Sequence, residues 1–376
     1  MRKRDYFPLG IAFGKAFCNR KEETDLLLNN ITNGKHTLLM ATRRYGKSSL
    51  ALHTISLSNL PYVETDFYMA STEKIVESYI LNSVVELIGK ALGNVDKLIS
   101  SIKKYIKTLK PRLEIGGANL KLELVAAVES DPATNVKEAL LLLERLLAEK
   151  GKQAVLLMDE FQNVGVIAKG TGIEAAIRHV AQKTKYLTII FSGSNRKLLQ
   201  TMFEDENRPL YKLCWKLTLQ RISATHYQSH LQKAAKEAWN EELEEAVIDK
   251  IFQLTARHPY YLNKLCDKLW TYYDTTPTIK NVELHWSEII AEEKSDAIKE
   301  ISALPSGQKN ALSKLAENET TQMTEKQTIM DLKMTGSSIA RALEGLEEKD
   351  IIEKVETGYQ IINPVIKFYV LKGKIS

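Results

Sequence analysis

Long apolar runs are missing from this sequence, and their absence bears on membrane insertion and secretion. No stretch of about 18 apolar residues occurs, so a membrane-spanning helix is not expected. The basic N-terminus is followed by an apolar stretch that Gly10, Gly14 and Lys15 interrupt, whereas a secretory signal carries an apolar core of about 7–15 residues. We therefore interpret the start of the chain as mature protein and expect no contact with membranes.

Cysteine is scarce as well. The three cysteines, Cys18, Cys214 and Cys266, are odd in number and far apart in the sequence. This pattern favours a reducing compartment, predicted to be the cytoplasm, over a disulfide framework or a cysteine zinc site. The seven histidines include no HExxH motif, so a zinc hydrolase is not expected either.

An excess of one charge is also lacking. The chain has 52 Lys+Arg against 47 Asp+Glu, a formal net charge of +5, with 44% hydrophobic and 26% charged residues. Such a composition is typical of globular proteins and excludes disordered and collagen-like chains. A length of 376 residues predicts two or three domains.

Short apolar runs alternate with amphipathic segments in the first part of the chain. The runs that predict buried strands are residues 36–42, 61–70, 153–161 and 185–195. The segments that predict helices are residues 17–33, 48–57, 72–108, 135–150 and 172–185, and residues 111–128 predict a hairpin around Gly116-Gly117. Alternating strands and helices with uniformly apolar strands predict an α/β fold whose parallel sheet is covered on both faces.

The strand pattern stops near residue 222. Residues 223–272 read as helices, and from residue 302 three helices precede a short hairpin at Thr357-Gly358, which is the order of elements in a winged helix. We therefore predict three domains, an α/β core over 1–222, a helical lid over 223–300 and a winged helix over 301–376.

The segment ATRRYGKSS, residues 41–49, has the pattern of a P-loop between a strand and a helix, with Ala41 in the place of the first glycine. Gly46 would let backbone N–H groups turn towards phosphates. Lys47 would neutralise the β- and γ-phosphates, and Ser48 would bind Mg²⁺ through its hydroxyl at the start of a helix whose dipole favours anions.

A second motif supports the first. Residues 154–160, AVLLMDE, form an apolar strand that ends in Asp159 and Glu160, as in a Walker B motif. Asp159 would hold the metal through water, and Glu160 would act as the general base for the attacking water. Together the two motifs predict a P-loop NTPase.

These motifs resemble those of the archaeal-type ATPases in the STAND branch of the AAA+ superfamily, which has bacterial members. The resemblance extends over nearly the whole chain, in residues 17–24, 40–50, 156–164, 190–211, 256–265 and 306–370. It implies a P-loop ATPase core followed by a helical lid and a C-terminal winged helix. It also implies ATP and Mg²⁺, bound between core and lid, and hydrolysis to ADP and phosphate that is slow in the isolated chain.

The resemblance further implies roles for individual residues. The nucleotide-binding set is Arg20, Arg43, Arg44, Tyr45, Gly46, Lys47, Ser48, Ser49, Ser194, His258 and Pro259. The metal ligands are Ser48 and Asp159, and the catalytic set is Lys47, Glu160, Asn195 and Arg208. Arg20 would lie near the adenine edge, and Ser194 or Asn195 would be the sensor of the γ-phosphate. His258 and Pro259 would contact the nucleotide from the lid.

The sequence does not decide which arginine would be the arginine finger. Lys212-Leu213 and Ala256-Arg257 stand where the family often has Gly-Arg and Gly-Gly. Arg208 is the first candidate, Arg178 and Arg221 follow, and Arg257 could act within the same chain as a sensor-2-like cation.

Two functions fit these features. The first is a nucleotide-driven molecular switch that regulates a partner protein or an assembly, with self-association coupled to turnover through a finger supplied in trans. The alternative is an ATP-licensed, DNA-binding regulator that uses the winged helix and the basic stretch 103–112. The predicted winged helix is neutral, with ten Lys/Arg and ten Asp/Glu in residues 301–376, and Glu344, Glu347 and Glu348 on its recognition helix argue against DNA.

Overall fold

The computed structural model describes residues 6–93, 98–116, 119–126, 130–167, 172–317, 323, 326–355 and 358–373. The predicted turn residues Gly117 and Thr357 lie outside these ranges. The chain forms two compact units. The sheet unit comprises Arg20–Thr42 and Lys47–Leu219, and the helical unit comprises Met1–Asn19, Arg43–Gly46 and Gln220–Ser376.

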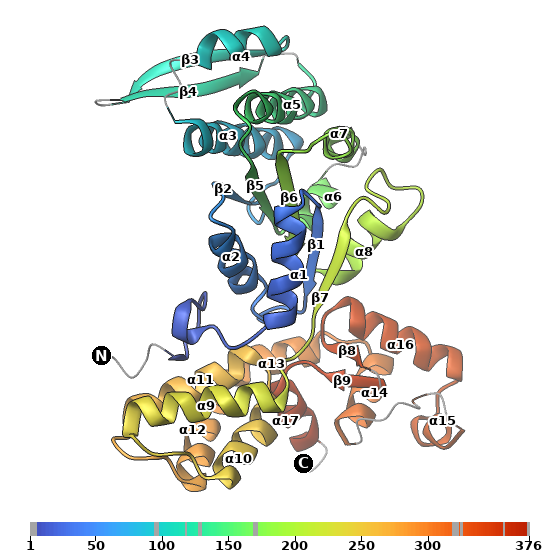
Figure 1. The fold of residues 1–376 in the computed structure, drawn as a ribbon. Helices are drawn as coiled ribbons and strands as arrows, with labels where there is room; N and C mark the ends of the chain where they lie inside the picture. The colour runs from blue at the N-terminus through green and yellow to red at the C-terminus, as the bar shows by residue number, and fades with distance from the viewer. Residues whose placement is uncertain are drawn as a thin grey trace. The chain divides into compact units, whose positions relative to one another are not determined.

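The sheet unit is built on a five-stranded, all-parallel sheet (Figure 1). Its strands are β1 (Thr37–Ala41), β2 (Tyr62–Asp66), β5 (Ala154–Asp159), β6 (Leu187–Gly193) and β7 (Trp215–Leu219), in the order β2-β5-β6-β1-β7. The four strands predicted from apolar runs are confirmed. β7 was not predicted, because this edge strand buries only Leu219 and therefore lacks a continuous apolar run.

Helices cover the sheet and flank it. They are α1 (Lys21–Thr32), α2 (Lys47–Ser58), α3 (Glu73–Leu92), α4 (Ile99–Tyr105), α5 (Pro132–Lys150), α6 (Gln162–Ile167), α7 (Gly172–Ala181) and α8 (Arg196–Glu204). In the described part of the segment predicted as mostly helical, 72–108, α3 ends before Gly93, which has a positive φ of 75°, and α4 begins at Ile99. The predicted hairpin forms a separate antiparallel sheet of β3 (Leu109–Gly116) and β4 (Asn119–Ala126), which packs with α4 on α3 and α5 (Figure 1).

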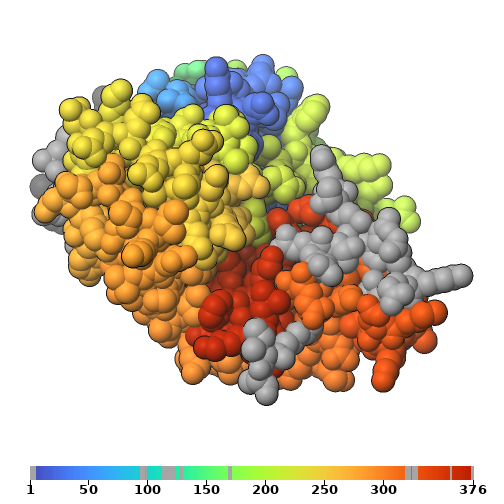
Figure 2. Space-filling model, turned by 90° about the horizontal axis from the view of Figure 1, so that it is seen from below, coloured from blue at the N-terminus to red at the C-terminus, as the bar shows by residue number. Residues whose placement is uncertain are grey.

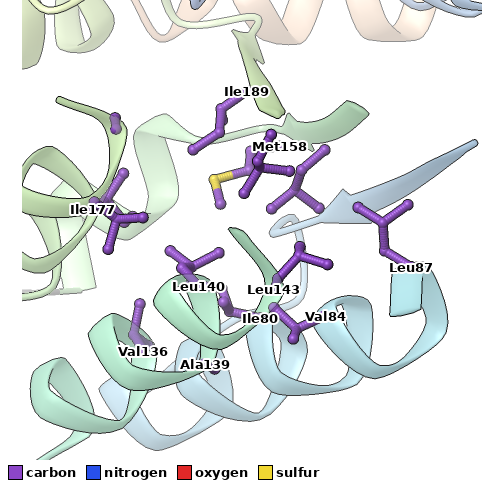
Figure 3. Packing of buried hydrophobic residues seen from close by; sticks show 14 of the residues in the cluster. Ile80, Val84, Leu87, Val136, Ala139, Leu140, Leu143, Met158, Ile177 and Ile189 are labelled. Atoms are coloured by element: carbon purple, nitrogen blue, oxygen red, sulfur yellow. The ribbon is translucent and has the colours of Figure 1, made fainter. Parts of the chain in front are cut away.

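The main core lies between the sheet and helices α3, α5 and α7. Successive strand residues point to opposite faces, and both faces of β5 are buried. Leu156 and Met158 pack with side chains of the three helices, such as Val84 and Leu140 (Figure 3). Burial on both faces explains why the central strands read as unbroken apolar runs.

The helical unit follows β7. Its elements are α9 (Ala224–Trp239), α10 (Glu245–Thr255), α11 (Pro259–Tyr272), α12 (Ile279–Glu292), α13 (Lys294–Ser302), α14 (Ser306–Glu317), α15 (Lys326–Leu332), α16 (Gly336–Glu348), β8 (Ile352–Val355), β9 (Gly358–Ile361) and α17 (Pro364–Lys372). The predicted order of three helices and a hairpin is present in α14 to β9. One apolar core joins α9–α12 with α14–α17, and the two groups lie directly against each other (Figure 2). The boundary between lid and winged helix therefore stays a prediction.

The N-terminal segment packs on the helical unit. Phe7 is 1% exposed, and its ring centroid lies 4.7 Å from that of Trp270. Asn263 Nδ2 donates to the carbonyl of Pro8 at 2.9 Å, and a short 3-10 helix, η2 (Gly14–Ala16), follows. None of the helices among the described residues combines the length and the apolar character needed to cross a membrane.

Candidate active site

The site begins at the loop between β1 and α2. Gly46 has a φ of 85° and Arg44 a φ of 64°, and the helix begins at Lys47. A side chain at position 46 would be strained in this left-handed region, so glycine is required there. Loop N–H groups that precede a helix N-terminus form a concave, positively polarised surface suited to anions. The local geometry is thus that of a phosphate-binding loop.

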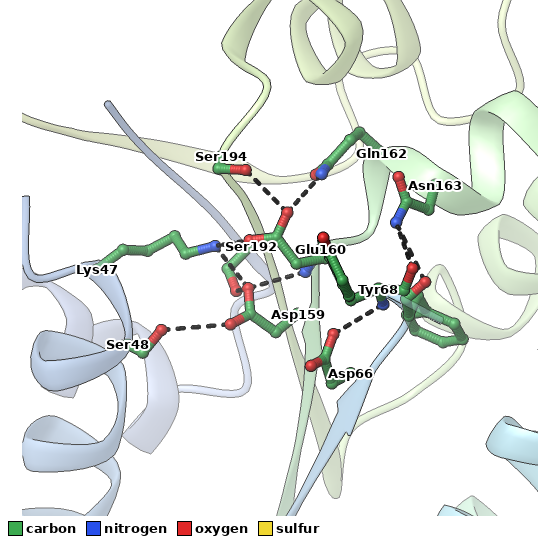
Figure 4. A network of polar contacts seen from close by, with 11 residues as sticks. Lys47, Ser48, Asp66, Tyr68, Asp159, Glu160, Gln162, Asn163, Ser192 and Ser194 are labelled. Carbon is green, nitrogen blue, oxygen red and sulfur yellow. Dashed lines mark hydrogen bonds and ion pairs between the residues drawn. The ribbon is translucent and has the colours of Figure 1, made fainter. Parts of the chain in front are cut away.

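Lys47 is the centre of a buried polar network. Its side chain is 9% exposed, and Nζ lies 2.6 Å from Asp159 Oδ1 and 3.2 Å from Glu160 Oε1 (Figure 4). Lys47 starts α2, and both acids follow β5, so elements far apart in the sequence bring the three charges together. The two carboxylates balance the ammonium and hold it at the carboxyl end of the sheet.

Asp159 is fixed by four donors. In addition to Lys47, its carboxylate accepts hydrogen bonds from Ser192 Oγ at 2.6 Å, Ser48 Oγ at 3.3 Å and the Glu160 backbone N–H at 2.8 Å. Burial alone would raise the pKa of Asp159, but the Lys47 charge and these hydrogen bonds outweigh it and lower that pKa. Asp159 is therefore ionised at neutral pH.

The residues present fit a magnesium ion. Mg²⁺ prefers hard oxygen ligands and is often bound by one or two protein groups, substrate phosphates and several waters. Asp159 Oδ2 and Ser48 Oγ supply such oxygens 3.3 Å apart. Clusters of three or more His, Cys, Asp or Glu side chains that could enclose a metal do not occur in the described part of the chain. The donor set thus suits Mg²⁺ shared with a phosphate better than an all-protein metal cage.

Glu160 lies at the end of β5 in a left-handed conformation, with a φ of 49°. Its Oε2 accepts from Ser194 Oγ at 2.9 Å and from Gln162 Nε2 at 2.5 Å. Burial raises the pKa of Glu160, but Lys47 and these two donors lower it overall. An ionised carboxylate with two fixed partners can orient a water molecule and accept its proton.

Three participants were not predicted from the sequence. Ser192 bonds Asp159, Gln162 bonds Glu160, and Gly193 leaves room for Gln162. A Cβ on Gly193 would lie 1.9 Å from Gln162 Oε1. The signal that could have found Ser192 and Gly193 is the small, polar end of the fourth predicted strand, FSGS. Gln162 follows the two acids in the segment DEFQ, residues 159–162.

The two sensor candidates have different partners. Ser194 is 9% exposed and bonds Glu160, whereas the Asn195 side chain caps α8 by accepting from the Leu198 N–H at 3.0 Å. Ser194 is therefore the residue that the structure brings into the network. Asn195 serves locally as a helix N-cap.

The finger candidates of the sheet unit bind other groups of this unit. Arg208 forms an ion pair with Glu174, which is fully buried on α7. Arg178 donates to the carbonyls of Pro209 and Tyr211. Both arginines thus stabilise the segment after α8 in this conformation.

The remaining predicted residues of the sheet unit lie at the starts of helices. Arg20 directly precedes α1, has a φ of 70° and donates to Glu23 Oε1 at 2.9 Å. Ser49 is buried in the first turn of α2.

Solved structures share this architecture. The Walker-type ATPase PABY2304 of Pyrococcus abyssi superposes with a TM-score of 0.68 at 18% identity, covering 97% of this chain and 99% of that one. The ORC2 protein of Aeropyrum pernix, in its ADPNP–ADP complexes, gives a TM-score of 0.56 at 12% identity, covering 100% of this chain and 98% of that one. The fold is that of the AAA+ P-loop ATPases. No protein-family model and no curated protein matches the sequence.

In this AAA+ fold, the P-loop residues 43–46 pack within the helical unit. The Arg44 guanidinium lies 3.9 Å from the centroid of the Tyr260 ring, and Tyr45, which is 1% exposed, meets His258 edge to face at 5.1 Å. His258 directly precedes Pro259 at the start of α11, is 3% exposed, and its Nδ1 has no hydrogen-bond partner in the described structure. The predicted nucleotide contacts of this unit are therefore close neighbours.

The other two arginine candidates belong to the helical unit. Arg257 donates to the carbonyl of Ile222 at 3.2 Å, and Arg221 donates to the Tyr45 hydroxyl and to Glu353. Arg221, like Arg208, is thus engaged within its own chain.

Proposed function

We propose that the chain is an ATP-binding, Mg²⁺-dependent P-loop ATPase that works as a nucleotide-driven molecular switch. The observation that carries this proposal is the single network of Lys47, Ser48, Asp159 and Glu160 behind a glycine loop. A G-K-S sequence that occurred by chance would not be expected to place its lysine against the two acids that follow β5. The AAA+ fold supports the same activity.

The chain's own residues can perform the steps of hydrolysis. Lys47 holds two carboxylates and can exchange them for phosphate oxygens, since both are anionic acceptors. Glu160, released from the ammonium, can then orient a water and take its proton, while Ser194 and Gln162 keep the carboxylate in place. Bound Mg²⁺, held through Ser48 and Asp159, would neutralise charge on the phosphates.

Steady-state ATP hydrolysis tests the assignment. We expect Lys47→Ala to abolish nucleotide binding and turnover. We expect Glu160→Gln to keep binding but to lower kcat roughly 10²- to 10⁴-fold, the range for loss of a general base. Lys90→Ala and Glu86→Gln, which break an exposed ion pair on α3, are the matched controls. Wild-type turnover in both site variants would disprove the catalytic assignment.

We further propose the STAND branch, the winged helix and regulation of a partner or of self-association. The order α14, α15, α16, β8, β9 supports the winged helix. Arg208 remains the first candidate for a finger in trans, which requires that it leave Glu174. We expect turnover per chain to rise with protein concentration in the wild type but not in Arg208→Ala.

DNA binding is the second candidate function. Lys103, Lys104, Lys107 and Lys110 are all exposed, which favours contacts with phosphates. The exposed Glu344 and Glu348 on α16 disfavour DNA on the winged helix. A mobility shift at low salt, with and without ATP, decides between the candidates, because phosphate contacts are strongest there. An unshifted duplex would remove this alternative.

A further inference from the structure

The P-loop carries a large buried aromatic side chain that phosphate binding does not require. Tyr45 directly precedes Gly46 and Lys47, and only 1% of it is exposed. Its hydroxyl donates to Glu353 Oε1 at 2.7 Å. Burial raises the pKa of Tyr45, so the phenol stays protonated and remains a donor. A side chain of the loop is thus bonded to an acid on β8, 308 residues later in the sequence.

Glu353 is held in place by its surroundings. It is 2% exposed, and the same oxygen, Oε1, accepts from Arg221 Nε at 3.0 Å and from Gln360 Nε2 at 2.5 Å. Gln360 is the cross-strand partner of Glu353 in the β8–β9 hairpin. The hairpin therefore fixes the acceptor to which the P-loop tyrosine binds.

Arg221 completes a buried triad with Tyr45 and Glu353. Its Nε also donates to the Tyr45 hydroxyl at 2.8 Å. Its other nitrogens donate to the carbonyls of Ala256 at 2.6 Å, Ile361 at 3.0 Å and Ile362 at 3.2 Å. The guanidinium thus joins the P-loop, the turn before α11 and the end of β9.

A network of this kind determines geometry more than it adds stability. Apolar residues of similar size can replace buried ion pairs at little or no loss of stability, whereas breaking one partner leaves a buried charge. The hydrogen bonds of the triad hold its partners in fixed directions. One of these partners, Tyr45, directly precedes Gly46, the glycine of the phosphate-binding loop. Its position indicates a role in the conformation of that loop.

We propose that Glu353 is a positioning residue for the P-loop, acting through Tyr45. The hydrogen bond holds the backbone of residues 43–46 in the conformation from which Gly46 and Lys47 receive phosphates. The β8–β9 hairpin thereby sets the affinity for nucleotide. This inference rests on the proposed ATPase function, because it names a residue that prepares the same site.

Three variants test the proposal. Tyr45→Phe removes only the hydroxyl and keeps the ring against His258. Glu353→Ala removes the acceptor, and Glu353→Gln restores an acceptor oxygen without the charge. Tyr369→Phe is the matched control, because the Tyr369 hydroxyl donates to the carbonyl of Ile290 at 3.0 Å in the same unit and not to the triad.

Two measurements separate positioning from stability. The first is amide hydrogen exchange of the peptide that contains residues 43–47 in nucleotide-free protein. The second is the Kd of a non-hydrolysable ATP analogue with Mg²⁺, together with KM and kcat. We expect Tyr45→Phe and Glu353→Ala to speed exchange in that peptide and to raise Kd and KM about tenfold, the size expected for one lost hydrogen bond to a charged group. We expect kcat to stay within about twofold.

The remaining outcomes are equally decisive. The double variant Tyr45→Phe/Glu353→Ala is expected to raise Kd no further than either single variant, because both substitutions remove the same hydrogen bond. Glu353→Gln is expected to recover part of the affinity for nucleotide. If Tyr45→Phe lowers Tm as Tyr369→Phe does but leaves Kd and exchange at wild-type values, the residues only stabilise the fold and the proposal is wrong. If the wild-type chain binds no nucleotide, the proposed function fails, and the exchange measurement alone decides the positioning role. Tyr45→Phe keeps the test valid if Glu353→Ala does not fold.

Discussion

At the scale of single residues, the absence of one side chain shapes the catalytic network. Gly193 ends β6, and a Cβ there would lie 1.9 Å from Gln162 Oε1 and 3.0 Å from Leu199 Cδ1. Gln162 is 5% exposed and donates to Glu160, so it has little space to move away. The glycine is therefore required for the orientation of the proposed general base.

We predict that Gly193→Ala lowers kcat for ATP roughly tenfold, as one hydrogen bond to Glu160 is lost. Nucleotide affinity should change little, because Lys47 and Ser48 are untouched. Steady-state kinetics and analogue binding measure the two effects. Gly89→Ala on α3 is the control, since a Cβ there meets no atom within 4 Å. An unchanged kcat in Gly193→Ala would mean that Gln162 does not orient Glu160.

The sequence indicates charged site residues more readily than the residues that hold them. Lys47, Ser48, Asp159 and Glu160 belong to motifs whose spacing reflects their chemistry, and the structure brings them together. Ser192 is part of the same network, but its role depends on β6 lying beside β5. Such neighbours are set by the order of strands in the sheet, which residue spacing does not encode.

At the scale of elements, burial decides what a sequence pattern can reveal. The central strands are buried on both faces and were predicted, whereas β7, with an exposed Trp215, was not. The β3–β4 hairpin was predicted from its alternating apolar residues, but the contact that holds it to α5 was not predicted. That attachment is Glu138 on α5, whose carboxylate accepts the backbone N–H groups of Lys107, Thr108 and Leu109.

We predict that Glu138→Gln loosens the start of β3. An amide oxygen is a weaker acceptor than a carboxylate, and hydrogen bonds to charged groups contribute about 1.5–3 kcal/mol. We expect faster amide exchange in Leu109–Gly116 and unchanged exchange in β5.

Burial raises the pKa of Glu138, but its hydrogen bonds lower it overall. Its stabilisation is thus present above the unfolded pKa and lost as pH falls through the folded one. Lys150→Gln, at the exposed end of the same helix, serves as the control, and equal exchange in both variants would refute the anchor.

At the scale of the whole molecule, histidines removed from solvent make the helical unit sensitive to acid. The helical unit contains His230 and His258, and burial lowers the pKa of the first to about 4 and of the second to about 3, with the Arg221 and Arg44 charges adding to the effect at His258. Both histidines therefore bind protons more weakly in the folded chain than in the unfolded one. The sequence does not reveal that His258 is buried and His230 half-buried.

We predict that the helical unit loses stability as pH falls below about 6.5, the pKa of an unperturbed histidine. Between that pH and the folded pKa values, the unfolded chain takes up the extra protons, so the free energy of unfolding declines by about 1.4 kcal/mol per pH unit for each histidine. The loss should be small above pH 7, where both states are neutral. Urea unfolding followed by tryptophan fluorescence measures it, because Trp239, Trp270 and Trp286 all belong to this unit. His230→Gln should reduce the slope between pH 6.5 and 5.5, whereas replacement of the exposed His226 by Gln should not. A slope that is identical in all three proteins would show that buried histidines do not cause the acid sensitivity.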